Sequence, residues 1–233
     1  MSNFSNVARG AMVTALLVSM TGCGGGGGSD NPPQGANPPP ATPAPTPAPA
    51  PTPTPTPPPA SPTPPVSATV QDLTNNPKVG VDRWPDPQTD GTPRAGLNCV
   101  VNPPNAVSLY AHVTILLNGE AQAIPRYVGA APSGGTRCFY PVHTDFSSGR
   151  VHVISATATT FTLGQMFEIW GQPLTNTNVA GITGLPVEIF VTDNGTVTKV
   201  ADTDWAAIEL RDHREITIGV GTPVTEIPNY TWN

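Results

Sequence analysis

Three of the four histidines in this 233-residue chain lie near one another in the sequence, and an aspartate accompanies them. They are His112, His143 and His152, with Asp145 two residues after His143. Neutral imidazole and carboxylate groups are ligands that copper and zinc accept in proteins. These residue types invite the hypothesis of a copper or zinc site. Because the spacing matches no recognised ligand motif, structural histidines bonded to backbone carbonyls or hydroxyls are the commoner explanation, and metal binding is the alternative.

The direction of these side chains depends on the local backbone. If residues 143–145 are extended, His143 and Asp145 point the same way, because alternate side chains of a strand share a face. His152 projects from the face opposite Val151 and Val153. The histidines could therefore converge if the two segments lie side by side.

Two serines close to the aspartate do not complete a catalytic triad. Ser147 and Ser148 lack the glycine pattern of a nucleophile elbow and lie in a predicted turn. We therefore expect a protein that is not an enzyme. We expect no cofactor either, unless the histidines hold copper or zinc.

Two β-hairpins are predicted to form much of the domain that carries the histidines. Apolar and polar residues alternate from Val107 to Leu117, Asn118-Gly119 suits a type I′ turn, and Glu120 to Ile124 forms the return strand. A second hairpin has the same design, with Val187 to Val191 and Thr196 to Val200 flanking another Asn-Gly pair. The expected fold class is α+β, dominated by antiparallel strands.

One helix is predicted to pack against these strands. Thr162 and Gln165 have the form of a capping box, and Gly171 followed by Pro173 ends the helix. An apolar stripe at positions i, i+3, i+4 and i+7 consists of Leu163, Met166, Phe167 and Trp170. We expect this stripe to face the core of the domain.

Two short strands, Arg150 to Ser155 and Thr159 to Thr162, are expected before the helix. Glu215 to Val220 is expected to be the last strand, with His213 in the turn before it and outside the metal site. The order from Arg150 onward resembles the ββαββ order of β-grasp domains. That resemblance implies a β-grasp-like C-terminal half, a topology that serves protein contacts and small-ligand binding and so selects no function.

The N-terminal segment has the features of an export signal. Arg9 precedes an apolar run from Ala11 to Met20, which is about half the length needed to span a bilayer. The stretch Leu16 to Cys23 resembles the lipobox of bacterial lipoproteins. This resemblance implies that residues 1–22 are a signal peptide and that Cys23 is fatty-acylated. A glycine after the cysteine favours the outer membrane as the destination.

A proline-rich spacer follows the cysteine, within residues 23–65. Asn31 to Pro65 contains eighteen prolines and no charged residue, so it cannot build a core. A polyproline II spacer of this length reaches roughly 100 Å. We expect an irregular lead-in over residues 66–95, whose packing the pattern does not reveal, and a single β-rich domain over 96–233.

Charges are sparse after the spacer, with fifteen acidic and nine basic residues. The basic residues are scattered and include only two lysines, Lys78 and Lys199. Nucleic acids and anionic membrane surfaces both require clustered Lys or Arg, so neither is an expected partner. The expected membrane contact is the lipid on Cys23, and the expected protein partner is a component of the cell envelope.

The remaining two cysteines, Cys99 and Cys138, are predicted to form a disulfide in an oxidising compartment. Closing a loop of about forty residues stabilises the fold by up to roughly 4 kcal/mol in the chain-entropy model. Buried free thiols or metal ligands are the alternative, although the spacing matches no zinc pattern.

Short motifs are spread from Gly96 to Val220. They are Gly96-Leu97-Asn98-Cys99, His112-Val113-Thr114-Ile115-Leu116-Leu117-Asn118-Gly119, Cys138-Phe139-Tyr140, His143-Thr144, Ser148-Gly149-Arg150-Val151-His152-Val153, Phe161-Thr162-Leu163-Gly164-Gln165, Trp170-Gly171-Gln172-Pro173-Leu174 and His213-Arg214-Glu215-Ile216. Together they resemble an uncharacterised family of exported bacterial proteins with no assigned activity. The resemblance implies that members of the family are richer in histidine at the positions where this chain has Ser108, Tyr110 and Asp145. They often carry glutamate where this chain has Ile154.

The sequence therefore predicts a cell-envelope lipoprotein that is tethered to a membrane and is not an enzyme. Its β-rich domain is expected to act as a binding or structural module. The alternative is a copper- or zinc-binding domain that uses His112, His143 and His152.

Overall fold

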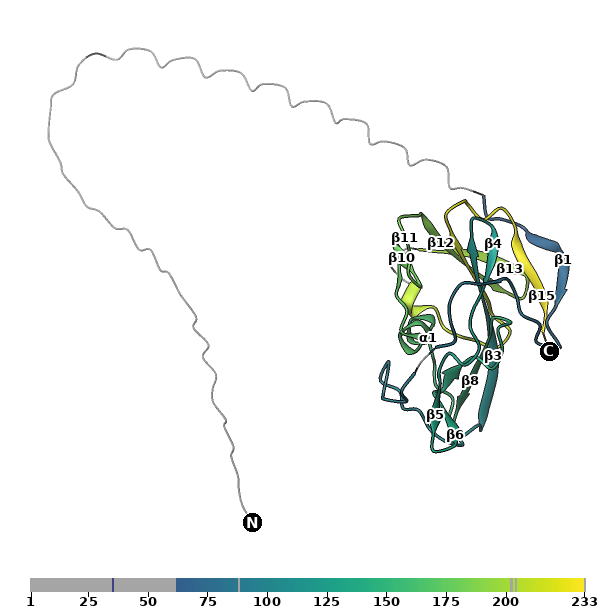
Figure 1. The fold of residues 1–233 in the computed structure, drawn as a ribbon. Coiled ribbons are helices and arrows are strands. Elements are labelled where there is room, and N and C mark those ends of the chain that lie inside the picture. Colours follow the sequence, from purple (N-terminus) through teal and green to yellow (C-terminus); the bar gives the residue numbers. More distant parts are fainter. Residues whose placement is uncertain (1–34, 36–61, 88, 202, 204, 233) are drawn as a thin grey trace. The chain divides into compact units, whose positions relative to one another are not determined.

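The long strand β3 (Val107–Leu117) lies at the centre of the main sheet (Figure 1). On one side it pairs in parallel with β14 (Glu215–Val220). On the other side its first half pairs with β8 (Arg150–Ser155) and its last residues pair with β4 (Glu120–Ala123), both antiparallel. The strand therefore connects the segment that carries His152 to the rest of the sheet.

This computed structural model describes residues 35, 62–87, 89–201, 203 and 205–232. The predicted signal peptide (1–22), the acylated Cys23 and most of the predicted spacer lie outside the described residues. Within the described part, no helix is both long enough and apolar enough to cross a bilayer.

Four further strands complete the main sheet. β12 (Val187–Asp193) pairs antiparallel with β14, and β13 (Thr196–Val200) pairs with β12 at the edge. β2 (Val81–Asp82) pairs in parallel with β4, and β7 (Val142–His143) pairs antiparallel with β8. The order β14, β3, β8, β7 places His143 on a strand next to that of His152.

Both predicted hairpins are present, and the α+β, β-dominated fold class is confirmed. Asn118 and Gly119 have φ values of 51° and 85°, and Asn194 and Gly195 have φ values of 49° and 77°. A type I′ turn requires positive φ at both central residues, which asparagine and glycine tolerate best. These two Asn-Gly pairs therefore fix the register of both hairpins.

The predicted helix is α1 (Leu163–Trp170), and both of its ends have the expected caps. The Thr162 side chain accepts a hydrogen bond from the Gln165 N–H, and the Gln165 side chain accepts one from the Thr162 N–H. Gly171 closes the helix in the left-handed conformation. The apolar stripe is buried in the main core, together with Ile169. Trp84 packs edge-on against Trp170, with ring centroids 5.0 Å apart.

A two-stranded layer covers part of the sheet face opposite α1 (Figure 1). In it β1 (Val66–Asp72) pairs in parallel with β15 (Ile227–Thr231). The Tyr230 hydroxyl lies 3.0 Å from the Thr114 hydroxyl on β3, and Leu73 packs with Tyr230 in a small second core. Residues 66–95, expected to be an irregular lead-in, thus contain two strands, and the described residues from 62 to 232 belong to one compact unit.

The end of the proline-rich segment contacts this layer. Pro64 is buried, and the Pro65 carbonyl accepts a hydrogen bond from the Ile227 N–H. The last residues of the predicted spacer therefore pack with the domain.

The remaining elements are short. They are β5 (Ala130–Ser133), β6 (Thr136–Phe139), β9 (Leu174–Thr175), β10 (Asn178–Val179), β11 (Ile182–Thr183) and the 3-10 helix η1 (Trp205–Ala207).

Two expectations for the C-terminal half are wrong. The strand expected at Thr159 to Thr162 is reduced to one isolated bridge between Thr162 and Glu209, so the order from Arg150 is not ββαββ. Residues 156–160 are exposed, and within the described part of the chain no strand pairs with them to extend the bridge into a ladder. Glu215–Val220 is also not the last strand, because β15 follows it.

Candidate metal centre

The site begins with two histidines on neighbouring strands. His143 on β7 and His152 on β8 are register partners, so their side chains project from the same face of the sheet. Their ring centroids lie 4.9 Å apart. Val151 and Val153 point into the core on the opposite face, as the alternation of β8 predicts.

Asp145 supplies the third group, two residues beyond His143. One carboxylate oxygen lies 3.8 Å from Nε2 of His143, and the other lies 3.6 Å from Nδ1 of His152. Both distances are longer than a strong hydrogen bond. The side chain of Asp145 is 39% exposed, whereas that of His143 is 4% exposed. The carboxylate thus closes the solvent side of the pair.

The second nitrogen of each ring has its own partner. Nδ1 of His143 lies 3.0 Å from the Tyr140 carbonyl, which can only accept, so this nitrogen carries the proton and Nε2 keeps its lone pair. Nε2 of His152 lies 2.9 Å from the Ser108 hydroxyl, which leaves Nδ1 toward Asp145. Metal-binding histidines in proteins are oriented by the same kind of outer hydrogen bond.

The protonation states also suit a metal ligand set. Loss of solvation lowers the pKa of His143 to about 4, although the charge of Asp145 opposes this shift, so the ring is neutral at neutral pH. The pKa of Asp145 is lowered, chiefly by the facing His152 side chain, so the carboxyl is ionised. Metal ions bind histidine and carboxyl groups in these deprotonated forms. The contact between His143 and Asp145 is therefore not an ion pair at neutral pH.

Aromatic rings hold both imidazoles in place. Tyr110, the register partner of His152 on β3, stacks on the His152 ring with centroids 4.4 Å apart and planes 16° apart. Phe139 lies 5.0 Å from the His143 ring. The four rings therefore form a row from β3 to the end of β6 in which each histidine ring contacts an aromatic ring.

A disulfide lies beside this row. Cys99 and Cys138 are bonded, the pairing expected from the sequence, with Cα atoms 5.2 Å apart. The next residue, Phe139, exchanges two backbone hydrogen bonds with Val100. The disulfide therefore ties the segment before His143 to the chain near Cys99.

His112, which we expected to join the site, does not lie in this cluster. It is 1% exposed, and its Nε2 donates to the Ser148 carbonyl at 2.9 Å. Its ring packs against Tyr230 with centroids 4.2 Å apart. His112 is therefore a buried structural histidine with a backbone partner. His213 lies in a turn as expected and contacts Asp212.

His143, Asp145 and His152 each offer one ligand atom, and these three atoms lie within 4.8 Å of one another. The ring nitrogens that face Asp145 are Nε2 of His143 and Nδ1 of His152. In a tetrahedral zinc site the ligand atoms are separated by roughly 3.3 Å. The three atoms would therefore have to move closer together to bind zinc, and Asp145 is the most exposed of the three side chains. Such a site has three protein ligands and an open position.

Ser108 and Tyr140 are the site residues that the spacing of histidines did not indicate. The contribution of Tyr140 is a backbone carbonyl, which leaves no mark in the sequence. Ser108 on β3 pairs with Ile154 on β8, and Ile154 lies two residues from His152. A correct prediction of how these two strands pair would therefore have placed Ser108 near His152.

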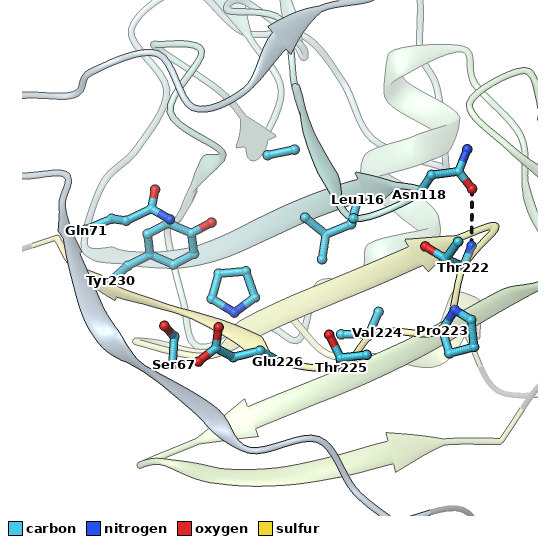
Figure 2. Close-up of a pocket in the computed structure, with 13 residues that line it drawn as sticks. Ser67, Gln71, Leu116, Asn118, Thr222, Pro223, Val224, Thr225, Glu226 and Tyr230 are labelled. Carbon is cyan, nitrogen blue, oxygen red and sulfur yellow. Dashed lines mark hydrogen bonds between the residues drawn. The ribbon is translucent and has the colours of Figure 1, made fainter.

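A groove that is separate from the histidine cluster lies between β1, the tip of the β3–β4 hairpin and residues 222–228 (Figure 2). Its volume is about 600 Å³. Figure 2 shows Asn118 bonded to the Thr222 N–H at one end and Gln71 beside Tyr230 at the other. Of the lining residues only Glu226 carries a charge, so the groove offers no cluster of metal ligands.

No family model matches the sequence, and searches of curated proteins and of solved structures return no match.

Proposed function

We propose that this protein is a tethered cell-envelope lipoprotein, not an enzyme, whose domain binds a zinc or copper ion through His143, Asp145 and His152. The observation that carries the metal-binding function is the convergence of three ligand atoms from these residues within 4.8 Å. The expected export and acylation at Cys23 would place this domain outside the cytosol.

The ligand chemistry favours zinc or copper over other divalent ions. Two imidazoles and one carboxylate suit zinc and copper, whereas calcium and magnesium require mainly oxygen ligands. Each imidazole also has a fixed outer partner, the Tyr140 carbonyl for His143 and the Ser108 hydroxyl for His152. These partners lower the reorganisation that binding requires.

The family resemblance predicted from the sequence concerns the same place, although no family model matches the chain and its departures from the family pattern weaken a shared site. The three positions at which it implies more histidine are Ser108, Tyr110 and Asp145. Each of the three contacts the His152 side chain, through a hydrogen bond, a stacked ring and a charged group respectively. A site shared with that family would therefore be centred on His152, with Ser108, Tyr110 and Asp145 in place of the family's histidines.

Metal titration of the purified, tag-free protein tests this function. Binding to the native state alone raises the melting temperature, and at a metal concentration 100 times Kd the gain is about 2.7 kcal/mol. We expect micromolar zinc or copper to raise the melting temperature of the wild type and of His213→Gln, whose substituted ring lies outside the cluster. No shift at micromolar metal would leave the cluster as a structural network and refute metal binding.

A further inference from the structure

A small cavity borders the metal-ligand cluster on the side of Asp145. It has a volume of about 80 Å³ and is lined by Asn76, Tyr110, Asp145, Phe146 and Arg150. The cavity therefore joins one proposed metal ligand to a guanidinium group. Its size admits a small ion but no larger organic molecule.

Arg150 uses only part of its hydrogen-bonding capacity in this cavity. One terminal nitrogen donates to the Asn76 side-chain oxygen at 2.9 Å, and the guanidinium carbon lies 4.4 Å from the Tyr110 ring centroid. Its Nε is buried and has no hydrogen-bond partner among the described residues. Leaving a buried N–H unpaired is costly, but a buried Nε is not open to the cavity, so a ligand there would accept from the terminal nitrogens of the guanidinium.

The charges of the site favour a negatively charged ligand once a metal is bound. Asp145 and Arg150 border the same cavity, but no ion pair forms between them within 4.0 Å in the described residues. A divalent ion coordinated by Asp145 would leave the cavity with excess positive charge from the ion and from Arg150. An anion beside both groups would offset this charge, in a place partly shielded from solvent.

We propose that the metal centre binds its ion together with a small planar oxyanion, a carboxylate or bicarbonate, which takes the open coordination position and accepts hydrogen bonds from Arg150. This inference rests on the proposed metal-binding function. The planar, forked guanidinium matches a carboxylate better than it matches a single-atom anion such as chloride. Asp145 is the ligand shared by the ion and the cavity, so it links the two binding events.

The experiment measures zinc affinity by competition with a chelator, in formate, in acetate and in chloride at equal ionic strength. Coupled sites typically change each other's affinity 5- to 150-fold, and we expect formate or acetate to tighten zinc binding about tenfold over chloride. Arg150→Gln should bind zinc with no difference between the salts. Sulfate, which is tetrahedral, should behave as chloride does.

Arg137→Gln is the matched control, because the Arg137 guanidinium also lies over a tyrosine ring, 4.1 Å from the centroid of Tyr127. It is exposed and does not line the cavity near Asp145. This variant should keep the full effect of formate. If Arg150→Gln does not fold, the visible spectrum of the cobalt-loaded wild type decides, since an anion that enters the coordination sphere must change that spectrum.

The outcomes separate the two proposals. Zinc binding that is equal in formate, acetate and chloride would overturn the oxyanion and leave the metal site intact. An equal effect of sulfate and formate, or an Arg150→Gln variant that keeps the tenfold effect, would also overturn it. No zinc binding in any salt would refute the metal site and the oxyanion together.

Discussion

His143 and His152 are register partners across β7 and β8, and their imidazole centroids lie 4.9 Å apart. Strand pairing fixes both backbones, while Tyr110 and Phe139 hold the rings from either side. The two imidazole rings are therefore held in place on the sheet, whereas Asp145, which follows β7, is the most exposed of the three side chains. Pre-positioned ligands bind more tightly because less freedom is lost on binding.

Replacing a ring ligand should remove most of the metal affinity. We expect His143→Gln to weaken zinc binding by at least about 100-fold, since loss of an outer partner alone costs 10- to 100-fold. Glutamine keeps a side-chain N–H that can donate to the Tyr140 carbonyl, so the fold should persist. Chelator competition measures the affinity, and His213→Gln is the control that should bind as the wild type does. Equal affinity in both variants would contradict the assignment of His143.

Removal of the outer partner of His152 should have a smaller effect. Ser108→Ala deletes the hydroxyl 2.9 Å from Nε2 of His152, and we expect about a tenfold loss of zinc affinity with no change in metal-free stability. Ser155→Ala is the control on the neighbouring strand, because Ser155 donates to the Thr157 carbonyl and does not contact the cluster. If both serine variants lost zinc affinity to the same extent, the loss would come from a general structural change and not from a change in the orientation of the His152 ring.

The stability of the metal-free protein should fall in mild acid because of His112. Burial lowers the pKa of this histidine to about 4 in the native state, whereas the unfolded chain has the ordinary value near 6.5. Between these pH values the unfolded state binds a proton that the native state lacks, so the free energy of unfolding decreases as the pH falls from 6.5 to 4. His143 acts in the same direction. Each such proton contributes a slope of up to about 1.4 kcal/mol per pH unit.

Urea unfolding at several pH values measures this slope. His112→Gln removes one titrating group and can still donate to the Ser148 carbonyl. The slope of its free energy of unfolding against pH should therefore be smaller by the contribution of about one proton. Above pH 6.5 the free energies of wild type and variant should change in parallel. An unchanged slope in His112→Gln would mean that His112 is not held neutral by burial.

The elements that the sequence predicted correctly are those with local signals. The Asn118-Gly119 turn and the Thr162 cap act within a few residues, so their effect does not depend on distant contacts. The two-stranded layer had no such signal. β1 follows a proline tract and has mostly exposed residues, and its partner β15 contains Pro228, so neither strand shows a buried alternating pattern.

The difference between local signals and distant contacts also explains which residues of the candidate site were predicted correctly. His143 and His152 could be placed on one face because alternation along a strand is a local property. His112 was misplaced because its position on β3 also puts it on that face, next to the register partner of His152. Its ring instead bonds the Ser148 carbonyl and packs against Tyr230 of the C-terminal strand. That contact follows from tertiary packing and could not be read from the spacing of histidines.

The disulfide should stabilise both the fold and the metal centre. It closes a loop with a sequence separation of 39 residues, for which the chain-entropy model gives up to roughly 4 kcal/mol. We expect Cys99→Ala/Cys138→Ala to lower the free energy of unfolding by about 2–4 kcal/mol. Zinc affinity should also fall, because Phe139 beside Cys138 packs on His143. Thiol alkylation of the unreduced wild type is the direct check, and two reactive thiols besides Cys23 would contradict the bond.

The lipid on Cys23 is the prediction that determines where the domain acts. Cells fed a labelled fatty acid should incorporate it into the wild type, and the labelled protein should sediment with membranes. Cys23→Ser removes the acceptor thiol, so we expect no label and release into the soluble fraction. Cys99→Ala/Cys138→Ala is the matched control, because it removes thiols of the folded domain and should keep both the label and the membrane association. Several acyl chains on one cysteine would hold the protein durably, whereas a single chain binds membranes only marginally. Wild-type protein without label in the soluble fraction would refute the tether while leaving the metal site of the domain to be judged by titration.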